Sequence, residues 1–354
     1  MSAPVLIART GAVGRIRLNR PKALHALTPD MCAAMLTALA DWEAQDPPAL
    51  VLLDHAEGRG FCAGGDIVQA SRDAALARAF FHVEYRLNHL LFTYEAPTLA
   101  VLDGVVMGGG VGIGLPCRWR IATERTLFAM PETGIGLFTD VGGGWYLSRL
   151  PGRLGEYLAL TGARLNGAEC HALGLATHYV PSAALPALTE ALLARPEAAE
   201  ALLDEAARDP GPAPILDRRA AIDRLFGGPD LESILAALAA EPGEWAAGLV
   251  AQLRGKAPLS AKACLRLVRE ARTRTDFAAE MEVEYRLATR MSALPDFAEG
   301  VRALLVDRDN APLWRPVTPE AVTPAMLDAL FAPLPPDEGW TALPGRAGTA
   351  PTDR

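Results

Sequence analysis

Two glycine-rich stretches decide the fold: residues 60–66 read GFCAGGD, and residues 107–114 read MGGGVGIG. Each follows an apolar run typical of a buried strand, Ala49–Leu53 before the first and Thr98–Leu102 before the second. Glycines between a strand and a helix let a ligand approach bare backbone N–H groups. Tight packing of the helix against the strand is the alternative explanation for either loop alone. Together the two loops predict a ligand site.

The first 181 residues alternate strand-like and helix-like patterns. Residues 5–18 alternate apolar and polar side chains around Gly11, which predicts a hairpin. A helix is predicted to begin with Thr28 as N-cap and Pro29 in its first turn, and to end before Pro47. Other predicted strands cover 98–102, 120–123 and 127–130, and other predicted helices cover 72–93, 141–160 and 168–174. This alternation favours an α/β fold with a mostly parallel sheet covered by helices on both sides.

The chain changes character after about residue 182. Alanine dominates, strand patterns vanish, and proline and glycine separate helix-like blocks, the strongest of which lies at 258–292. From Pro333 the sequence is rich in Pro, Gly and Thr, which is typical of a loosely held tail. We therefore predict a catalytic core at 1–181, a helical region at 182–332 that completes the fold, and a flexible tail at 333–354.

Composition excludes several classes of protein. The net charge of -8 argues against a nucleic-acid binder, which needs a basic face for phosphates. No apolar run is long enough to span a bilayer, and the N-terminal residues lack a targeting pattern, so a cytoplasmic protein without membrane contact is expected. The five cysteines are scattered without a CxxC pair, as expected of buried residues in a reducing compartment.

The sequence does not match other common nucleotide-binding and catalytic motifs. Residues 58–63, GRGFCA, fit the loosest dinucleotide pattern, but four residues separate them from the preceding strand. No P-loop ends in Gly-Lys-Ser/Thr, and no serine stands in a G-x-S-x-G elbow. The histidines have no spacing that suggests a metal site or a triad, so no metal is expected.

The order of several motifs matches a known superfamily. LNRP at 18–21, GFCAGGD at 60–66, the run from Pro97 to Gly104, GGG at 108–110 and MPET at 130–133 resemble the enoyl-CoA hydratase/isomerase (crotonase) superfamily. The resemblance implies a crotonase-like fold of repeated ββα units with a helical C-terminal region. It also implies an acyl-CoA substrate, no separate cofactor, and an oxyanion hole made by the N–H groups of Gly65 and Gly109. Fixed N–H donors of that kind stabilise the oxyanion of an attacked thioester.

Carboxylates distinguish members within the superfamily. Hydratases that resemble this chain use two glutamates, one after the glycine triplet and one in the Pro-Glu motif. Here the first position is Gly112 and the second is Glu132, while Asp140 stands where those hydratases carry glycine. Two-glutamate hydration is therefore not expected as the main activity.

Three longer stretches resemble the 3-hydroxyisobutyryl-CoA hydrolase family: FFHVEYRLN at 80–88, FAMPETGIGLFTDVGGG at 128–144 and DFAEGVRALLVDRD at 296–309. The resemblance covers roughly residues 5–330. It implies hydrolysis of a short branched 3-hydroxyacyl-CoA, as in valine catabolism. The substrate-contacting positions of that family correspond to Glu84, Gly109, Glu132 and Asp140. His25 departs from the family, which more often has asparagine there, and Arg20 or Lys22 could meet the CoA phosphates.

The residue roles leave alternatives open. Glu132 would activate water or attack the carbonyl itself. Asp140 would orient the water or hold the substrate hydroxyl, and could instead be a helix N-cap. Glu84 would shape the acyl pocket, and could instead pair with Arg78 or Arg86 on a solvated face. Enoyl-CoA or dienoyl-CoA isomerase or hydratase activity is the nearest rival function, a silent acyl-CoA-binding or scaffold protein is a rival of another class, and homo-oligomer formation stays open.

Overall fold

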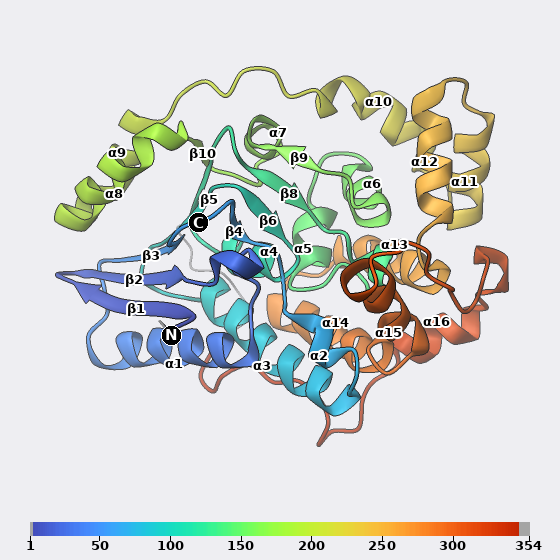
Figure 1. Ribbon diagram of the computed structural model, residues 1–354, viewed down its shortest axis with the longest axis horizontal. Helices are drawn as coiled ribbons and strands as arrows, with labels where there is room; N and C mark the ends of the chain where they lie inside the picture. The colour runs from blue at the N-terminus through green and yellow to red at the C-terminus, as the bar shows by residue number, and fades with distance from the viewer. Residues whose placement is uncertain (1–2, 347–354) are drawn as a thin grey trace.

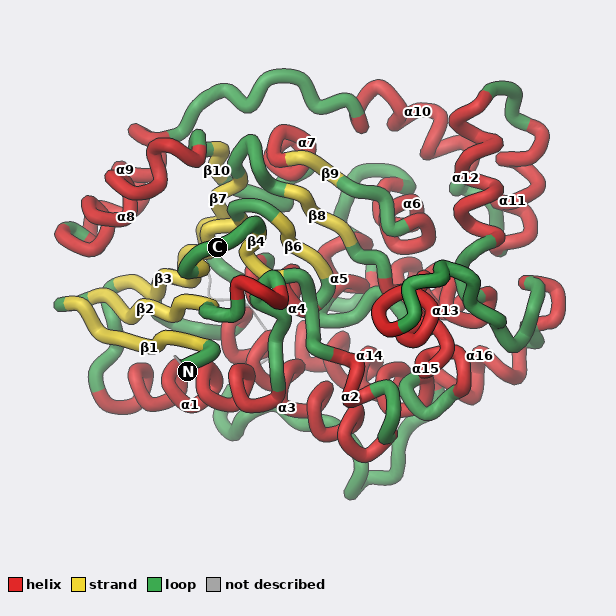
Figure 2. Tube along the Cα trace, viewed as in Figure 1, coloured by secondary structure: helices red, strands yellow, loops and turns green. Residues whose placement is uncertain are grey.

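Two β-sheets form the centre of the computed structural model, which describes residues 3–346 (Figures 1 and 2). The six-stranded sheet runs in the order β1 (Val5–Thr10), β2 (Val13–Leu18), β3 (Leu50–His55), β5 (Thr98–Leu102), β7 (Trp119–Ala122) and β10 (His178–Tyr179). The four-stranded sheet runs in the order β4 (Gly60–Cys62), β6 (Val105–Met107), β8 (Leu127–Ala129) and β9 (Leu165–Asn166). Only the β1–β2 and β8–β9 pairs are antiparallel. The predicted α/β fold with a mostly parallel sheet is confirmed.

Helices cover both faces of the six-stranded sheet because alternate side chains of its strands point to opposite faces. In β3, Leu50 and Leu52 pack toward α8 (Leu185–Ala194) and α9 (Ala199–Ala206). Val51 and Leu53 belong to the larger core on the other face, together with apolar residues of α1 (Pro29–Gln45) and α3 (Ala74–Phe92). Figure 1 shows these two helix pairs on either side of the sheet.

Three repeated ββα units bring the functional loops together. The strand pairs β3–β4, β5–β6 and β7–β8 each send their first strand to the large sheet and their second to the small one. Helical segments follow each pair: α2 (Ile67–Ala70) with α3, then α4 (Gly109–Gly114), then a 3₁₀ turn at Glu132–Ile135. Because β4, β6 and β8 are parallel, the segments that follow them lie at the same edge. The repeated-unit prediction is therefore confirmed, and it explains how distant loops meet.

The local helix predictions hold with one correction. The 5–18 hairpin forms as expected, and α1 begins at Pro29 with Thr28 Oγ1 accepting from the Met31 N–H at 3.2 Å. The single helix predicted over 141–160 is wrong: the structure has α5 (Gly143–Ser148) and α6 (Leu154–Thr161). Proline at 151, which lacks an N–H, and Gly152, with a φ of 62°, interrupt the helix.

After β10 the described residues form helices and no further strand, and the last helix, α16 (Pro324–Phe331), ends next to the predicted limit of the helical region at residue 332. Two separate helices lie within residues 258–292: α13 (Pro258–Ala271) packs on α5 and α6, and α14 (Phe277–Met291) packs on α3. The helices not yet introduced are α7 (Gly167–Ala172), α10 (Ile215–Leu225), α11 (Leu231–Ala240), α12 (Glu244–Arg254) and α15 (Pro295–Val301).

The segment from residue 333 differs from the expected loose tail as far as it is described. Residues 333–346 pack against α3: the ring of Trp340, 5 % exposed, contacts His89, and Glu338 pairs with Arg78 at 2.7 Å. The Arg346 side chain donates to the carbonyl of Thr93 at 3.2 Å. Burial of the Trp340 ring offsets the entropy that ordering this segment costs. Residues 347–354 lie outside the described part of the chain.

Candidate active site

A cavity of about 310 Å³ lies at the edge where the ββα units meet. All five residues predicted for the site line it: Gly65, Glu84, Gly109, Glu132 and Asp140. The structure thus brings together residues that the sequence separates by up to 75 positions, 140 minus 65. The other side chains of the wall are mainly apolar, namely Ile67, Phe80, Phe81, Met107, Ile135, Leu137, Leu304 and Leu305.

The two glycine loops place two amides next to each other. A Cβ atom built on Gly109 would lie 3.3 Å from the Gly65 nitrogen and would overlap the carboxylate of Glu84. Within residues 3–346, no carbonyl accepts a hydrogen bond from either amide. The first loop is held because Leu27 donates to the Gly64 carbonyl at 2.8 Å and accepts from Asp66 at 2.7 Å. Two N–H groups therefore lie unpaired beside the cavity.

Three carboxyl groups share this apolar cavity. Glu84, Glu132 and Asp140 are each no more than 4 % exposed. Burial raises the pKa of all three, and the charge of Asp140 raises the pKa of Glu84 and Glu132 further. Burial raises the pKa of Asp140 to about 7, and the hydrogen bond from Tyr85 partly opposes this rise. Clustered groups with perturbed pKa values in a cleft are typical of catalytic sites.

The carboxylates of Glu84 and Glu132 each keep one oxygen available. Glu84 Oε1 and Glu132 Oε2 are buried and have no hydrogen-bond partner among the described residues. Tyr85 donates its hydroxyl proton to Asp140 Oδ2 at 2.9 Å. Burying a carboxylate oxygen without a hydrogen bond destabilises the folded state, so these two oxygens indicate that a bound molecule supplies the missing hydrogen bonds.

The structure excludes the alternative explanations for two of these acids. Glu84 points inward, while Arg78 pairs with Glu338 and Arg86 donates to the carbonyl of Thr341. Asp140 does not cap α5 with its side chain, since Gly142 is the N-cap residue of that helix. Neither acid is part of an ordinary surface helix motif.

The missing second glutamate has a steric cause. A Cβ atom on Gly112 would lie 2.5 Å from the Cβ of Val141 and 2.8 Å from Nδ2 of Asn88. Real Cβ atoms do not approach other atoms so closely, so any side chain at Gly112 would force its neighbours to move. Val141 therefore occupies the space into which a glutamate at residue 112 would have to grow.

Sequence reasoning missed three residues that act on these acids. Tyr85 holds Asp140, and its only signal was its position beside Glu84 on one helix. The charge of Lys256 lowers the pKa of Glu132, against the effect of burial, and an Ala257 N–H to Thr133 carbonyl bond of 3.0 Å anchors the lysine backbone there. Glu284 contacts the loop after Asp140. Lys256 lies in the connection between α12 and α13 and Glu284 lies in α14, both far from the acids in the sequence, so no local pattern marks them.

His25 has a structural role at its unusual position. Its φ is 57°, in the left-handed region that asparagine and histidine adopt more readily than most residues. The buried ring accepts from the Arg20 N–H at 2.9 Å and contacts the Glu57 carbonyl at 2.8 Å. Arg20 itself pairs with Asp66 at 2.8 Å, whereas Lys22 is exposed. A histidine therefore suits the left-handed backbone at this position.

A first prediction concerns the effect of the buried acid Glu84 on the pH dependence of stability. Because folding raises the pKa of Glu84, its stabilising contribution is complete below its unfolded pKa of about 4.3 and is lost as pH rises through the folded value. Glu84→Gln should therefore melt increasingly above the wild type as pH rises from 5 to 8, a rise of one in the pKa being equivalent to about 1.4 kcal/mol. Thermal melts across this range, with Glu190→Gln on the exposed face of α8 as control, measure this. A difference that shrinks with pH contradicts it.

The chain belongs to the Enoyl-CoA hydratase/isomerase family, whose model matches residues 13–331. Within it the chain is similar to 3-hydroxyisobutyryl-CoA hydrolases. The probable 3-hydroxyisobutyryl-CoA hydrolase 2 of Arabidopsis thaliana is 39 % identical, over 96 % of this chain and 94 % of that protein. The mitochondrial 3-hydroxyisobutyryl-CoA hydrolase of Danio rerio is 40 % identical, over 93 % of this chain and 90 % of that protein.

Two solved structures share the whole fold. A carnitinyl-CoA dehydratase from Mycobacterium thermoresistibile has a TM-score of 0.90 and 40 % identity, covering 95 % of this chain and 98 % of that one. An enoyl-CoA hydratase from Rhodobacter sphaeroides 2.4.1 has a TM-score of 0.88 and 37 % identity, covering 96 % and 100 %. Among residues 3–346, none of the helices combines the length and apolar character needed to cross a bilayer.

Proposed function

We propose that this chain hydrolyses the thioester of a short branched 3-hydroxyacyl-CoA, with 3-hydroxyisobutyryl-CoA as the first candidate. The observation that carries the proposal is the pairing of Glu132 and Asp140 with two unpaired amides around one apolar cavity, while Gly112 supplies no second glutamate. The hydrolase names of the relatives that cover more than nine tenths of the chain support it.

Thioester hydrolysis uses these groups as follows. The Gly65 and Gly109 N–H groups hold the carbonyl oxygen as it becomes an oxyanion; loss of such a donor costs about 3–4 kcal/mol. Glu132 takes a proton from water, whose oxygen bonds to the carbonyl carbon. The C–S bond then breaks, and the proton passes to the CoA sulfur, leaving the carboxylic acid and free CoA. On the alternative route the Glu132 carboxylate bonds to the carbonyl carbon, the C–S bond breaks and CoA leaves as its thiolate. Water then hydrolyses the resulting anhydride, which restores Glu132 and supplies the proton that the CoA sulfur takes up.

The remaining acids and Lys256 set up this step. Burial raises the basicity of Glu132, which favours proton abstraction, and the Lys256 charge favours its ionised form at neutral pH. Asp140, oriented by Tyr85, would hold the attacking water or the substrate hydroxyl. Glu84, with an unpaired oxygen near Gly109, would shape the acyl end of the cavity.

The setting of the reaction is part of the same proposal. Coenzyme A enters as part of the substrate, so the chemistry above needs no further cofactor or metal. A place in valine catabolism follows from the candidate substrate. The cytoplasmic location expected from the sequence stays a prediction, and the Danio rerio relative is named as mitochondrial.

Enoyl-CoA hydration is the second candidate, because the two similar solved structures carry hydratase or dehydratase titles. The space that Val141 fills beside Gly112 argues against a two-glutamate hydratase. We predict that Asp140→Gly depresses hydrolysis without creating efficient hydration, since Gly112 still supplies no second carboxylate, and that Asp140→Asn is also slow. Water addition to crotonyl-CoA measures this. Hydration by the glycine variant that rivals wild-type hydrolysis would overturn the assignment.

The experiment that tests the function is a thioester screen. Wild-type protein is incubated with 3-hydroxyisobutyryl-CoA, other short 3-hydroxyacyl-CoAs and crotonyl-CoA in the presence of a thiol reagent. Hydrolysis releases free CoA, whereas isomerisation and hydration leave the thioester intact. Release from the branched 3-hydroxyacyl substrate above all others is the expected result; an intact thioester throughout would reject hydrolase activity.

A further inference from the structure

The loop that carries Asp140 has an unusual backbone. Val141, the next residue, is buried and has a φ of 55°, and Gly142 has a φ of 84°. A left-handed conformation is a true outlier for a β-branched residue such as valine. Strained residues of this kind persist only where the surrounding structure holds them, and they gather at functional sites. Contacts from the surrounding structure must therefore stabilise this loop conformation.

Glu284 of α14 holds the loop from behind. Its Oε2 accepts a hydrogen bond from the Gly142 N–H at 2.7 Å, and its Oε1 accepts from the Gly144 N–H at 3.2 Å. The side chain is fully buried and does not line the cavity. A carboxylate that accepts two backbone N–H bonds makes strong, directional contacts. Glu284 thus fixes the two peptides on either side of the Asp140–α5 junction.

A second contact from the same helix reaches the Asp140 side chain. The ring of Tyr285 packs edge-on against the ring of Tyr85, with centroids 6.2 Å apart and planes at 76°. The Tyr85 hydroxyl donates to the Asp140 carboxylate at 2.9 Å. Neighbouring residues of α14 therefore set both the backbone of the loop and the orientation of the acid.

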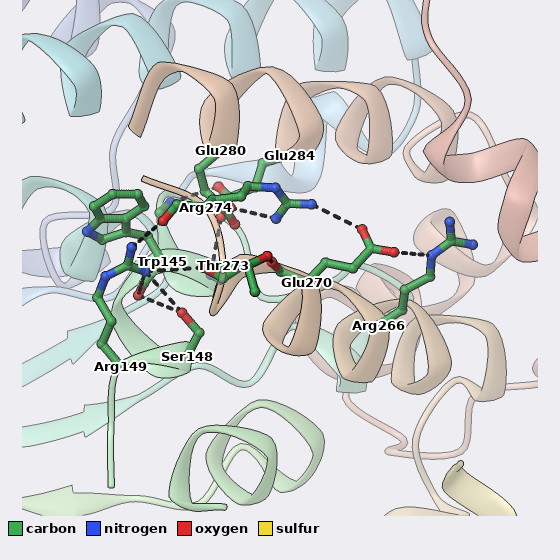
Figure 3. A network of polar contacts seen from close by, with 12 residues as sticks. Trp145, Ser148, Arg149, Arg266, Glu270, Thr273, Arg274, Glu280 and Glu284 are labelled. Carbon is green, nitrogen blue, oxygen red and sulfur yellow. Dashed lines mark hydrogen bonds and ion pairs between the residues drawn. The ribbon is translucent and has the colours of Figure 1, made fainter. Parts of the chain in front are cut away.

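The surroundings of Glu284 are also charged. Figure 3 shows Glu280 and Arg274 beside it. Arg274 pairs with Glu280 at 2.6 Å and with Glu270 at 3.1 Å. Glu270 also pairs with Arg266 at 2.7 Å, and its ion pairs are with Arg266 and Arg274 and not with the 140–144 loop. Glu284 is thus the acid of this network that accepts hydrogen bonds from the loop, whereas Glu270 is exposed and serves as a matched control.

We propose that Glu284 is a positioning residue for catalysis: it holds the strained Val141–Gly144 backbone so that Asp140 faces the thioester. This inference rests on the proposed function, because it assigns Asp140 a part in hydrolysis. It predicts that Glu284 acts only through Asp140 and not on the binding of CoA.

Glu284→Gln tests this with little change in shape. The amide keeps one acceptor oxygen but turns an NH₂ group toward a backbone N–H, so one of the two loop contacts is lost. Displacement of a catalytic group by ~1 Å can cost about 10²-fold in rate. We expect kcat for the best thioester to fall about 10- to 100-fold with little change in KM. Glu270→Gln, which removes ion pairs in the same network, should keep wild-type kcat and KM.

A double-mutant cycle separates positioning from general support of the fold. If Glu284 acts through Asp140, Glu284→Gln should slow the Asp140→Asn enzyme little further. Losses that multiply in the double variant, or a wild-type kcat in folded Glu284→Gln, overturn the proposal. Should the glutamine variant not fold, Glu284→Asp, which keeps the carboxyl group on a shorter side chain, enters the same cycle with the same criteria.

Hydrogen exchange distinguishes this inference from the function itself. The amides of Gly142 and Gly144 should exchange faster in Glu284→Gln than in the wild type or in Glu270→Gln, whether or not any thioester is hydrolysed. Unchanged exchange across residues 140–146 overturns the positioning role. Faster exchange in a protein whose wild type hydrolyses no thioester would reject the proposed function and leave the structural contact in place.

Discussion

Glu132→Gln should lose most thioester hydrolysis, by roughly 10²–10⁴-fold, while the protein stays folded. The amide has nearly the shape of the acid but can neither accept a proton from water nor attack the carbonyl. Because burial raises the pKa of Glu132, replacing it with a neutral group should not lower the melting temperature at neutral pH. Thiol release and thermal melts on one preparation measure both effects.

The controls for Glu132→Gln follow from its surroundings. Calorimetry with free CoA should show unchanged binding, since Glu132 lines the apolar cavity to which the proposed function assigns the acyl group. Wild-type turnover in the folded variant would remove Glu132 from the mechanism. Loss of CoA binding or of the fold would make the lost activity uninformative about proton transfer, and the melts and calorimetry detect both.

Gly109→Val should abolish turnover. A side chain at this position would overlap the Glu84 carboxylate and lie 3.2 Å from Cδ1 of Leu27, so it would take the space that the acyl thioester needs beside the two amides. Backbone strain is not the cause, because the left-handed residue of the triplet is Gly108, with a φ of 47°, and Gly109 is the first residue of α4. The thiol-release assay measures the loss, and circular dichroism follows the fold.

The matched control for Gly109→Val is Gly248→Val in α12. A Cβ atom at Gly248 would meet no atom within 4 Å, so the same substitution there changes a helix without crowding a neighbour. Free CoA should still bind to both variants. If folded Gly109→Val hydrolyses its best thioester at nearly the wild-type rate, the oxyanion site does not lie at Gly109.

Much of the fold could be predicted because short stretches of sequence specify its individual helices and strands. The alternation in residues 5–18, the Thr28 cap and the apolar runs before the glycine loops each specify one element. Their convergence follows from parallel ββα units, which bring the segments after β4, β6 and β8 to one edge. The break between α5 and α6 was missed although Pro151 and Gly152 mark it, because the apolar pattern continues through both helices.

The parts that could not be predicted depend on packing between distant segments. Lys256, in the connection between α12 and α13, acts on Glu132, and Glu284 of α14 acts on the Asp140 loop; neither position is marked by its own local sequence. The fit of Val141 against Gly112 likewise exists only in three dimensions. Trp340 is a single aromatic residue in a Pro- and Gly-rich segment, so composition gave no sign that it would pack on His89.

The most direct test of thioester hydrolysis is the fate of the water oxygen. Wild-type protein is incubated with 3-hydroxyisobutyryl-CoA in water enriched in oxygen-18, and free CoA and the acid are measured by mass spectrometry. Hydrolysis predicts one free CoA for each 3-hydroxyisobutyrate, with oxygen-18 entering the carboxylate over repeated turnovers, and with both products forming roughly 10²–10⁴-fold more slowly in Glu132→Gln. An intact thioester with no free CoA and no labelled acid would contradict the account.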